Sequence, residues 1–201
     1  MTQAGHAHGT PDRAGVLLTN LGTPDAPTEQ AVRRYLAEFL SDRRVIELSP
    51  LLWQPILHGI ILRTRPRKSA SAYARIWTDA GSPLLSISKR QAGLVDAALT
   101  RMHPDGAIVT ALGMRYGTPS IASALEYLRA ANVQRLLVFP LYPQYSATTT
   151  GSTFDAVADV LKRWRWVPEL RFINHYHDDA AYITALADSV QRHQEQHGKP
   201  D

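Results

Sequence analysis

One junction, residues 135–152, constrains the fold of this chain more than any other segment. The apolar run 136–139 has the length of a buried strand, which we expect to cover 136–141. Pro140 and Pro143 end it, because proline cannot donate a hydrogen bond to a central ladder. A loop follows that carries aromatic rings and hydroxyls but no acid, His or Cys. Ligands of parallel α/β sheets bind at such loops, and this composition favours a large, flat, apolar ligand over hydrolytic chemistry.

Strands and helices alternate along the rest of the chain. Besides 136–141, strands are expected at 15–21, 107–112 and 170–173. A first helix is expected after Thr28, which serves as its N-cap. Another is expected from Pro119, at the N1 position, to Asn132. Four more helices are expected at about 69–77, 84–102, 150–165 and 179–197. The last helix is expected to turn Ile183, Leu186, Ala187 and Val190 inward. This alternation predicts an α/β fold with a parallel, doubly wound sheet and helices on both faces.

Composition excludes several classes of protein. The 201 residues suffice for one good core and are too few for two comfortable domains. The formal net charge of +4 is too small for a dedicated nucleic-acid binder, so we expect no nucleic-acid partner. Because the chain has no Cys, it holds no disulfide, no thiolate nucleophile and no Cys ligand for zinc or an iron–sulfur cluster.

The sequence predicts three parts. Residues 1–13 form a polar leader that we expect to be disordered, 14–175 an α/β domain, and 176–201 a helix. The leader has no apolar core of a signal peptide, and no run of 18 apolar residues occurs, so a cytoplasmic protein is expected. The turn at 197–201 should feed another strand, so we expect the chain to be truncated before a second domain.

Residues 48–68 combine a very apolar stretch with a basic cluster, Arg63, Arg65, Arg67 and Lys68. Pro50, Pro55 and Gly59 argue against a regular core helix. An apolar surface beside basic residues is typical of peripheral binding to anionic lipid. From the residues alone, a core segment and a membrane-facing segment are equally supported.

The histidines favour structural roles. His175 and His177 flank Tyr176 and precede two carboxylates, a pattern that can bind a metal ion. A polar loop in which Asp178 or Asp179 caps the next helix is the more frequent arrangement, and we predict it here, with no metal site. His193 and His197, spaced i, i+4 on the last helix, are expected to be solvated.

Four segments together, 17–24, 73–84, 113–119 and 139–152, resemble ferrochelatase, the enzyme that inserts ferrous iron into a porphyrin. The resemblance covers about residues 14–201 and implies the chelatase-type fold, in which porphyrin lies in a cleft between two Rossmann-like halves. The catalytic His and Glu of that family are expected beyond residue 201, so the catalytic residues of this chain are unknown. The resemblance also implies that the segment 48–68 is a lip of the cleft that faces the membrane.

The resemblance assigns porphyrin-binding roles to ten residues. Leu21 lies beside the porphyrin face, where the branch of the family that acts on coproporphyrin has Tyr, so it implies protoporphyrin as substrate. The other residues at ring edges, propionates or the cleft floor are Arg65, Tyr73, Ser82, Arg115, Tyr116, Tyr142, Gln144, Tyr145 and Ser146. Without the resemblance, Arg115 and Tyr116 are more simply an exposed cation and a ring that caps the next helix.

The sequence therefore predicts porphyrin binding and insertion of ferrous iron into protoporphyrin IX to form haem b. Iron is a substrate, no cofactor is permanently bound, and weak peripheral contact with a membrane surface is expected. The chain alone is expected to be catalytically incompetent. The alternative is a non-catalytic α/β module that binds a porphyrin or a partner.

Overall fold

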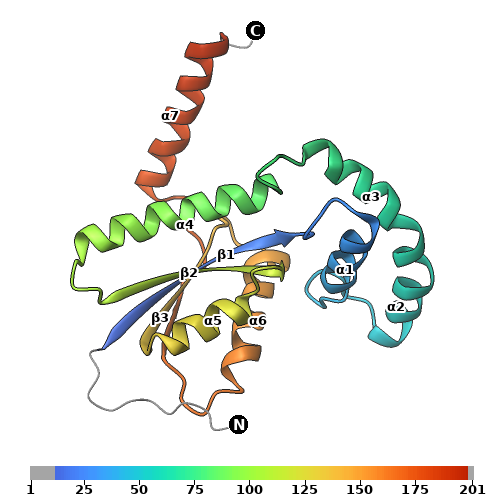
Figure 1. Cartoon of the computed structure of the whole chain (residues 1–201), viewed down its shortest axis with the longest axis horizontal. Helices are drawn as coiled ribbons and strands as arrows, with labels where there is room; N and C mark the ends of the chain where they lie inside the picture. The colour runs from blue at the N-terminus through green and yellow to red at the C-terminus, as the bar shows by residue number, and fades with distance from the viewer. Residues whose placement is uncertain (1–11, 199–201) are drawn as a thin grey trace.

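The computed structural model describes residues 12–198, which form a parallel sheet flanked by helices (Figure 1). Within this range the sheet has four strands in the order β2-β1-β3-β4. Their bounds are β1 Arg13–Thr23, β2 Ile108–Gly117, β3 Val133–Pro140 and β4 Glu169–Phe172. All three strand pairs are parallel, which confirms the predicted α/β sheet.

Strand β1 lies in the middle of the sheet because its residues are apolar on both faces. Val16, Leu17 and Leu18 are buried, as is the neighbouring Thr19. Strands covered on both sides read as continuous apolar runs in parallel sheets. The short edge strand β4 is instead mostly exposed.

Helices cover both faces of the sheet (Figure 1). On one face α5 (Ile121–Ala130) and α6 (Ser152–Leu161) form the main core with β1 and β3, centred on Leu17, Leu125, Val138 and Val157. The helix α4 (Pro83–Met102) packs on the other face against β1 and β2. On that face Asn20 Nδ2 donates to Ser88 Oγ over 3.1 Å.

A helical lobe lies beyond the carboxyl end of β1 (Figure 1). It comprises α1 (Glu29–Leu40), α2 (Pro50–Ile56), the π-helical turn η1 (Leu57–Ile61) and α3 (Leu62–Ile76). As expected, 48–62 is not a regular core helix: it consists of the short α2, none of whose residues is buried, and the π-helical turn η1. The helix expected at 69–77 is the end of α3. Buried Leu57 and Leu62 and the contact of α3 with α1 offset the local cost of Pro55, and the π turn absorbs the irregularity.

Three other expectations need correction. Residues 1–11 of the expected leader lie outside the described range, but Arg13 already belongs to β1. Pro119 is not at N1 of α5, because Ser120 is the N-cap and the helix begins at Ile121. The helix α7 (Ala180–His197) has no buried residue, so Ile183, Leu186 and Val190 do not face a core; the helix extends away from the sheet (Figure 1).

Within residues 12–198, no helix combines the length and the apolar character needed to cross a bilayer.

Candidate functional site

The predicted binding residues of three strands meet at the carboxyl edge of the sheet. Asn20 pairs with Met114 and Gly22 with Tyr116, so Leu21, near the end of β1, lies level with Arg115 and Tyr116 near the end of β2. The amide of Leu141, just after β3, donates to Thr19 O over 2.8 Å. Parallel strands bring these positions together regardless of their separation in the sequence.

Arg115 and Tyr116 are held by a buried carboxylate that the sequence did not single out. Arg115 Nη2 lies 2.5 Å from Asp42 Oδ2, and Tyr116 Oη donates to the same oxygen over 2.8 Å. Arg115 Nε donates to Ser152 O and Oγ over 3.0 and 2.6 Å, and Ser152 Oγ donates to Asp42. We call Asp42, Arg115, Tyr116 and Ser152 the Asp42 network. It joins the loop after α1 to the end of β2 and the start of α6.

Hydrogen bonds and the Arg115 charge, acting against burial, decide the charge state of Asp42. The Asp42 side chain is 6% exposed and that of Arg115 is 18% exposed. Burial alone would raise the pKa of Asp42, but hydrogen bonds from Ser152, the Arg44 amide and Tyr116, together with the Arg115 charge, hold that pKa below its usual value. Asp42 is therefore a carboxylate at neutral pH, and it compensates the Arg115 charge. The reading of Arg115 as an exposed cation is wrong.

An aromatic cluster from the lobe covers the Asp42 network. The ring of Tyr116 is fully buried and meets Tyr35 and Phe39 edge-on at 6.4 and 5.2 Å. Tyr73 in turn meets Tyr35 and Trp77 edge-on, each at 6.4 Å. Burial raises the pKa of Tyr35, Tyr73 and Tyr116, so these phenols stay protonated at neutral pH and act as neutral hydrogen-bonding groups.

The loop after β3 contributes Tyr142 to the same region. Burial raises the pKa of Tyr142, and its hydroxyl, with no hydrogen-bond partner among residues 12–198, is enclosed by protein. Gln144 and Tyr145 are exposed. Ser146 caps the π-helical turn η2 (Ala147–Gly151) by accepting from the Thr148 amide, so its hydroxyl already has a structural role.

The other predicted site residues differ in placement. Leu21 is half-buried at the end of β1. Ser82 is buried at the N-cap of α4, although its side chain does not cap that helix. Arg65 is exposed on α3, and within the described part of the chain no hydrogen bond or ion pair holds its guanidinium. The structure thus brings Tyr73, Arg115, Tyr116 and Tyr142 into one cluster and leaves Arg65 outside it.

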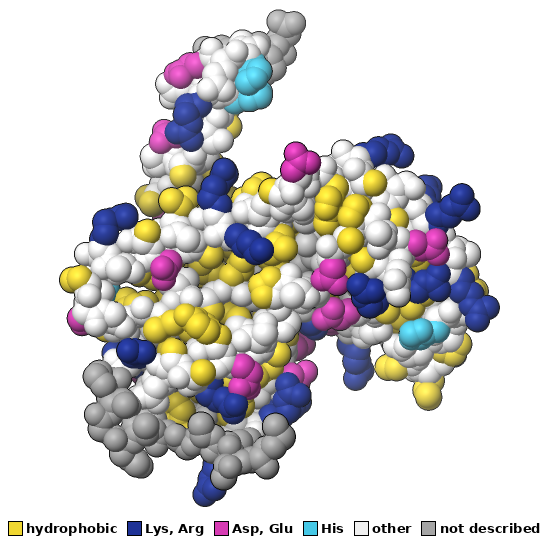
Figure 2. Space-filling model, viewed as in Figure 1, with side chains coloured by type: hydrophobic (Ala, Val, Ile, Leu, Met, Phe, Trp, Pro, Cys, Tyr) yellow, Lys and Arg dark blue, Asp and Glu magenta, His cyan; other side chains and the backbone are white. Residues whose placement is uncertain are grey.

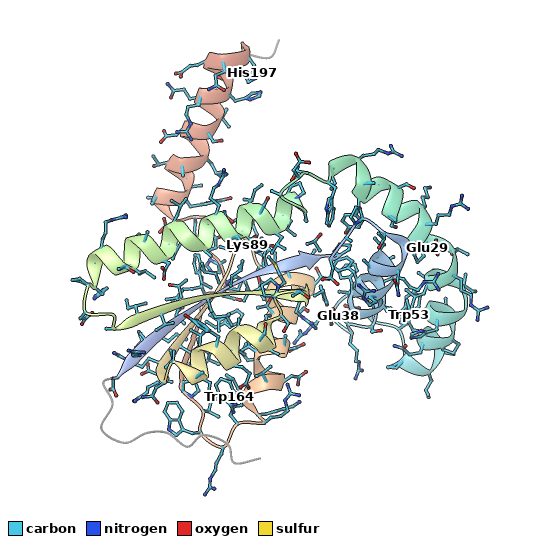
Figure 3. All side chains as sticks on the ribbon, viewed as in Figure 1. Glu29, Glu38, Trp53, Lys89, Trp164 and His197 are labelled. Atoms are coloured by element: carbon cyan, nitrogen blue, oxygen red, sulfur yellow. The ribbon has the colours of Figure 1, made fainter. Side chains whose placement is uncertain are left out.

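A small hollow lies beside this cluster. It has a volume of about 240 Å³ and is lined by the end of β1, the end of β2 and α1, including Thr23, Arg34, Tyr35 and Glu38. Glu38 Oε2 accepts from the Gly117 amide over 2.9 Å, and Figure 3 shows this side chain between the lobe and the sheet. Pockets for ligands of drug size measure about 300–1,000 Å³, so these residues form a wall and do not enclose a macrocycle.

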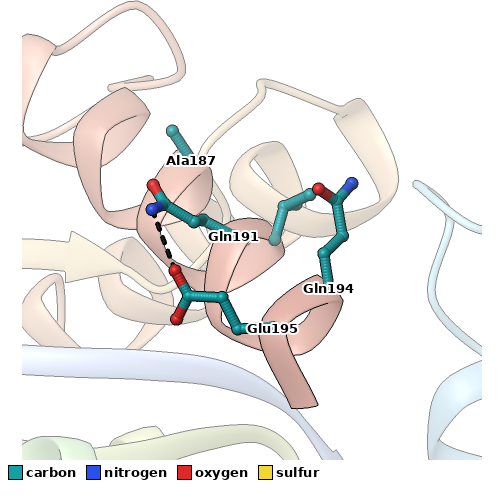
Figure 4. A pocket seen from close by; sticks show the side chains of 5 residues that line it. Ala187, Gln191, Gln194 and Glu195 are labelled. Carbon is teal, nitrogen blue, oxygen red and sulfur yellow. Dashed lines mark hydrogen bonds between the residues drawn. The ribbon is translucent and has the colours of Figure 1, made fainter. Parts of the chain in front are cut away.

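A second hollow is lined by α7 alone. Its residues are Ala187, Val190, Gln191, Gln194 and Glu195 (Figure 4). Gln191 Nε2 donates to Glu195 Oε1 within the same helix, over 3.0 Å. Because only one helix lines it, the hollow is an open helix face, not an enclosed site.

The loop before α7 confirms the predicted cap. Asp179 Oδ1 accepts from the amides of Ala181 and Tyr182 over 2.9 and 3.2 Å. His175, His177 and Asp178 are exposed, and their potential ligand atoms lie within 4.8 Å of one another. The prediction of a cap is confirmed, but it does not explain why these three side chains converge.

Sequence reasoning missed Asp42 and gave Ser152 and Tyr35 no role in the site. Asp42 stands in the polar run Ser41-Asp42-Arg43-Arg44, which has the composition of a solvated loop. Its partners Arg115 and Ser152 lie 73 and 110 positions further along the chain. No local pattern signals such a contact.

Comparison with known proteins supports the resemblance. The ferrochelatase family model matches residues 13–201. A ferrochelatase of Thioalkalivibrio sulfidiphilus is 56% identical over 197 residues, covering 98% of this chain and 53% of its own length. A ferrochelatase of Hydrogenovibrio crunogenus is 57% identical, with 98% and 53% covered, and ferrochelatase 2 of Shewanella oneidensis is 55% identical, with 96% and 58% covered. The chain spans about half the length of these relatives, and it belongs to the ferrochelatase family.

Proposed function

We propose that this chain forms one wall of a porphyrin site in an enzyme that inserts ferrous iron into protoporphyrin IX to form haem b. The observation that carries the proposal is the convergence of Leu21, Arg115, Tyr116 and Tyr142 at the carboxyl edge of the sheet. Apolar and aromatic groups with a few fixed polar atoms are what a flat macrocycle needs. Leu21 supports protoporphyrin over coproporphyrin.

In this proposal the described residues bind the porphyrin ring, and other groups accept the protons that are released during iron insertion. Insertion of iron releases two pyrrole protons, which need an acceptor. The phenols of the cluster stay protonated, and the Asp42 carboxylate is engaged with Arg115, Tyr116 and Ser152. None of these groups suits proton transfer at neutral pH. Their contribution is to hold a surface against which a distorted porphyrin binds better than a flat one.

Individual roles follow from burial. Leu21, at the surface of the edge, contacts a ring face. Arg115 and Tyr116 lie beneath the surface and fix its shape, because a ligand would reach the fully buried Tyr116 ring only after Tyr35 and Phe39 move. The unpartnered Tyr142 hydroxyl is available to a polar group of a ligand after a small side-chain movement. For Arg65 and Ser82 the propionate role rests on the family resemblance alone, since Arg65 is exposed outside the cluster and Ser82 is buried. No resident cofactor is proposed, and iron enters as substrate.

Porphyrin binding is expected to depend on Leu21. One wall buries a single face of the ring, so the chain should bind protoporphyrin with a Kd on the order of micromolar or weaker, measured by porphyrin fluorescence. Leu21→Asp should weaken binding by about tenfold or more, because it places a charge against an apolar ring. Leu94→Asp, at an exposed position of α4, is the matched control. Equal binding by both variants, with unchanged melting temperatures, would contradict the proposal.

The lip segment, residues 48–68, is proposed to contact an anionic membrane surface on the cytoplasmic side. Leu51 and Leu52 are 88% and 68% exposed, and Ile60 is 58% exposed. Arg63, Arg65, Arg67 and Lys68 are exposed on the adjoining α3. Figure 2 shows basic side chains along the outer edge of the lobe beside hydrophobic side chains at its tip.

Binding to vesicles tests this contact. The chain should sediment with vesicles that contain phosphatidylserine, and salt should weaken the binding. Arg65→Glu together with Arg67→Glu should reduce the partition coefficient by about tenfold or more, since each basic residue near an anionic surface contributes about 1 kcal/mol. The control is Arg101→Glu, at the far end of α4. Equal partition into neutral and anionic vesicles would remove the electrostatic part of the proposal.

A further inference from the structure

A loop with two imidazoles and one carboxylate follows β4. His175 Nδ1 and Asp178 Oδ1 are 3.8 Å apart, and the ring centroids of His175 and His177 are 5.2 Å apart. The potential ligand atoms of all three residues lie within 4.8 Å of one another, and all three side chains are exposed. At 3.8 Å the His175–Asp178 pair is too long for a hydrogen bond, so no strong mutual contact explains the cluster.

The backbone of this loop is held in place by the residue between the histidines. The Tyr176 amide donates to Pro143 O over 2.9 Å. Its ring stacks on Phe139 of β3 at 5.0 Å and meets Tyr182 of α7 edge-on at 5.4 Å. With Tyr176 packed inward, both flanking imidazoles stay on the outer side of the loop. The convergence of the donors is therefore built into an anchored segment.

The two adjacent carboxylates have separate roles. Asp179 caps α7 through the amides of Ala181 and Tyr182 and cannot turn outward without losing both bonds. Asp178 makes no such bond, and its side chain is 73% exposed. The helix cap thus accounts for one carboxylate and leaves the other beside the imidazoles.

We propose that His175, His177 and Asp178 bind a first-row divalent metal ion. Two imidazoles and a carboxylate are typical ligands of Zn²⁺, Co²⁺ and Fe²⁺, and three protein ligands leave coordination positions open. Bonds of about 2.1 Å place ligand atoms at most about 4.2 Å apart, and exposed side chains can close the remaining difference by small rotations. Because all three side chains are exposed, we expect the metal ion to bind weakly and to exchange with the solvent.

The position of this metal site indicates a role in holding iron for insertion, and that role rests on the proposed function. Pro143, which accepts the Tyr176 amide, belongs to the same loop as Tyr142 and Ser146. The site therefore adjoins the loop proposed to line the porphyrin cleft. A ferrous ion held there would be stored close to the ring that receives it.

Titration with Co²⁺ tests the site, because bound Co²⁺ gives visible absorption that reports its ligands. The chain holds competing donors: His193 and His197 stack at 4.3 Å on α7, and His6 and His8 lie near the N-terminus. All proteins should therefore carry His6→Ala and His8→Ala. In that background, His175→Ala with His177→Ala should weaken Co²⁺ binding by about tenfold or more, and Asp178→Asn by less. The matched control, His193→Ala with His197→Ala, should retain the site.

The outcomes separate this inference from the proposed function. Unchanged Co²⁺ binding after loss of His175 and His177, or loss of binding in the control, would overturn the inference. Protoporphyrin fluorescence is measured on the same proteins without metal. If no protein perturbs that fluorescence but Co²⁺ binding still depends on His175 and His177, the metal site stands and the porphyrin proposal fails.

Discussion

The substitution Gly22→Ala is expected to cost most or all of the stability of this protein. Gly22 lies in β1 with φ +103°, a conformation that residues with a side chain rarely adopt. A Cβ atom at this position would lie 1.8 Å from the carbonyl oxygen of Tyr116. That oxygen belongs to the backbone of the neighbouring strand, so relief requires β1 and β2 to separate. We expect a loss of about 4–5 kcal/mol or more, close to the whole stability of a marginal domain.

Urea denaturation followed by circular dichroism measures this loss, and Gly81→Ala isolates its cause. Gly81 has a similar φ of +90°, but a Cβ atom there would meet nothing within 4 Å. Its substitution should cost only the backbone strain, about 1–3 kcal/mol. Equal losses at the two positions would mean that strain alone, and not the close approach of β1 to Tyr116, explains the glycine at position 22.

The sheet could be predicted because its signals are local. Each strand is an apolar run, and alternation with helices selects the parallel arrangement. The caps at Thr28 and Asp179 were also readable, since a cap depends on two or three neighbouring residues. Strand lengths were underestimated, because β1 and β2 continue through polar and glycine positions to Thr23 and Gly117, where pairing with the neighbouring strand is the deciding factor.

Features that depend on packing between residues far apart in the chain could not be predicted from the sequence. Proline and glycine in 50–59 argued only against a regular core helix, and they did not predict the short α2 and the π-helical turn that the burial of Leu57 and Leu62 stabilises. The amphipathic pattern of α7 predicted a face packed against the core. Such a pattern shows that a helix has an apolar face, but it does not show that the described residues supply a surface to cover it. For the candidate site, motifs located Arg115 and Tyr116, whereas their partner Asp42 is brought in by the path of the chain after α1.

Loss of the Asp42 carboxylate is expected to be the second large effect. Asp42→Ala would leave the Arg115 charge, 18% exposed, without its ionic partner, and Tyr116 without the acceptor of its 2.8 Å hydrogen bond. Breaking a buried ion pair costs about 3–5 kcal/mol, and the partial exposure of Arg115 places this case near the lower end of that range. Chemical denaturation at pH 7 measures the loss. Asp155→Ala, which removes the exposed partner of Arg44 on the same surface, should cost less than about 1 kcal/mol.

The pH dependence gives the Asp42 network a signature that simple loss of packing lacks. Because its partners hold the pKa of Asp42 below its usual value, the carboxylate contributes stability at all pH values above the unfolded pKa of about 3.9. That contribution falls as the pH drops through the lower pKa of the folded state. The difference in unfolding free energy between the wild-type protein and Asp42→Asn should therefore be constant above about pH 5 and shrink in acid. A difference that stays constant from pH 7 down to the acid limit of folding would show that the charge of Asp42 contributes nothing, and that the network acts through shape alone.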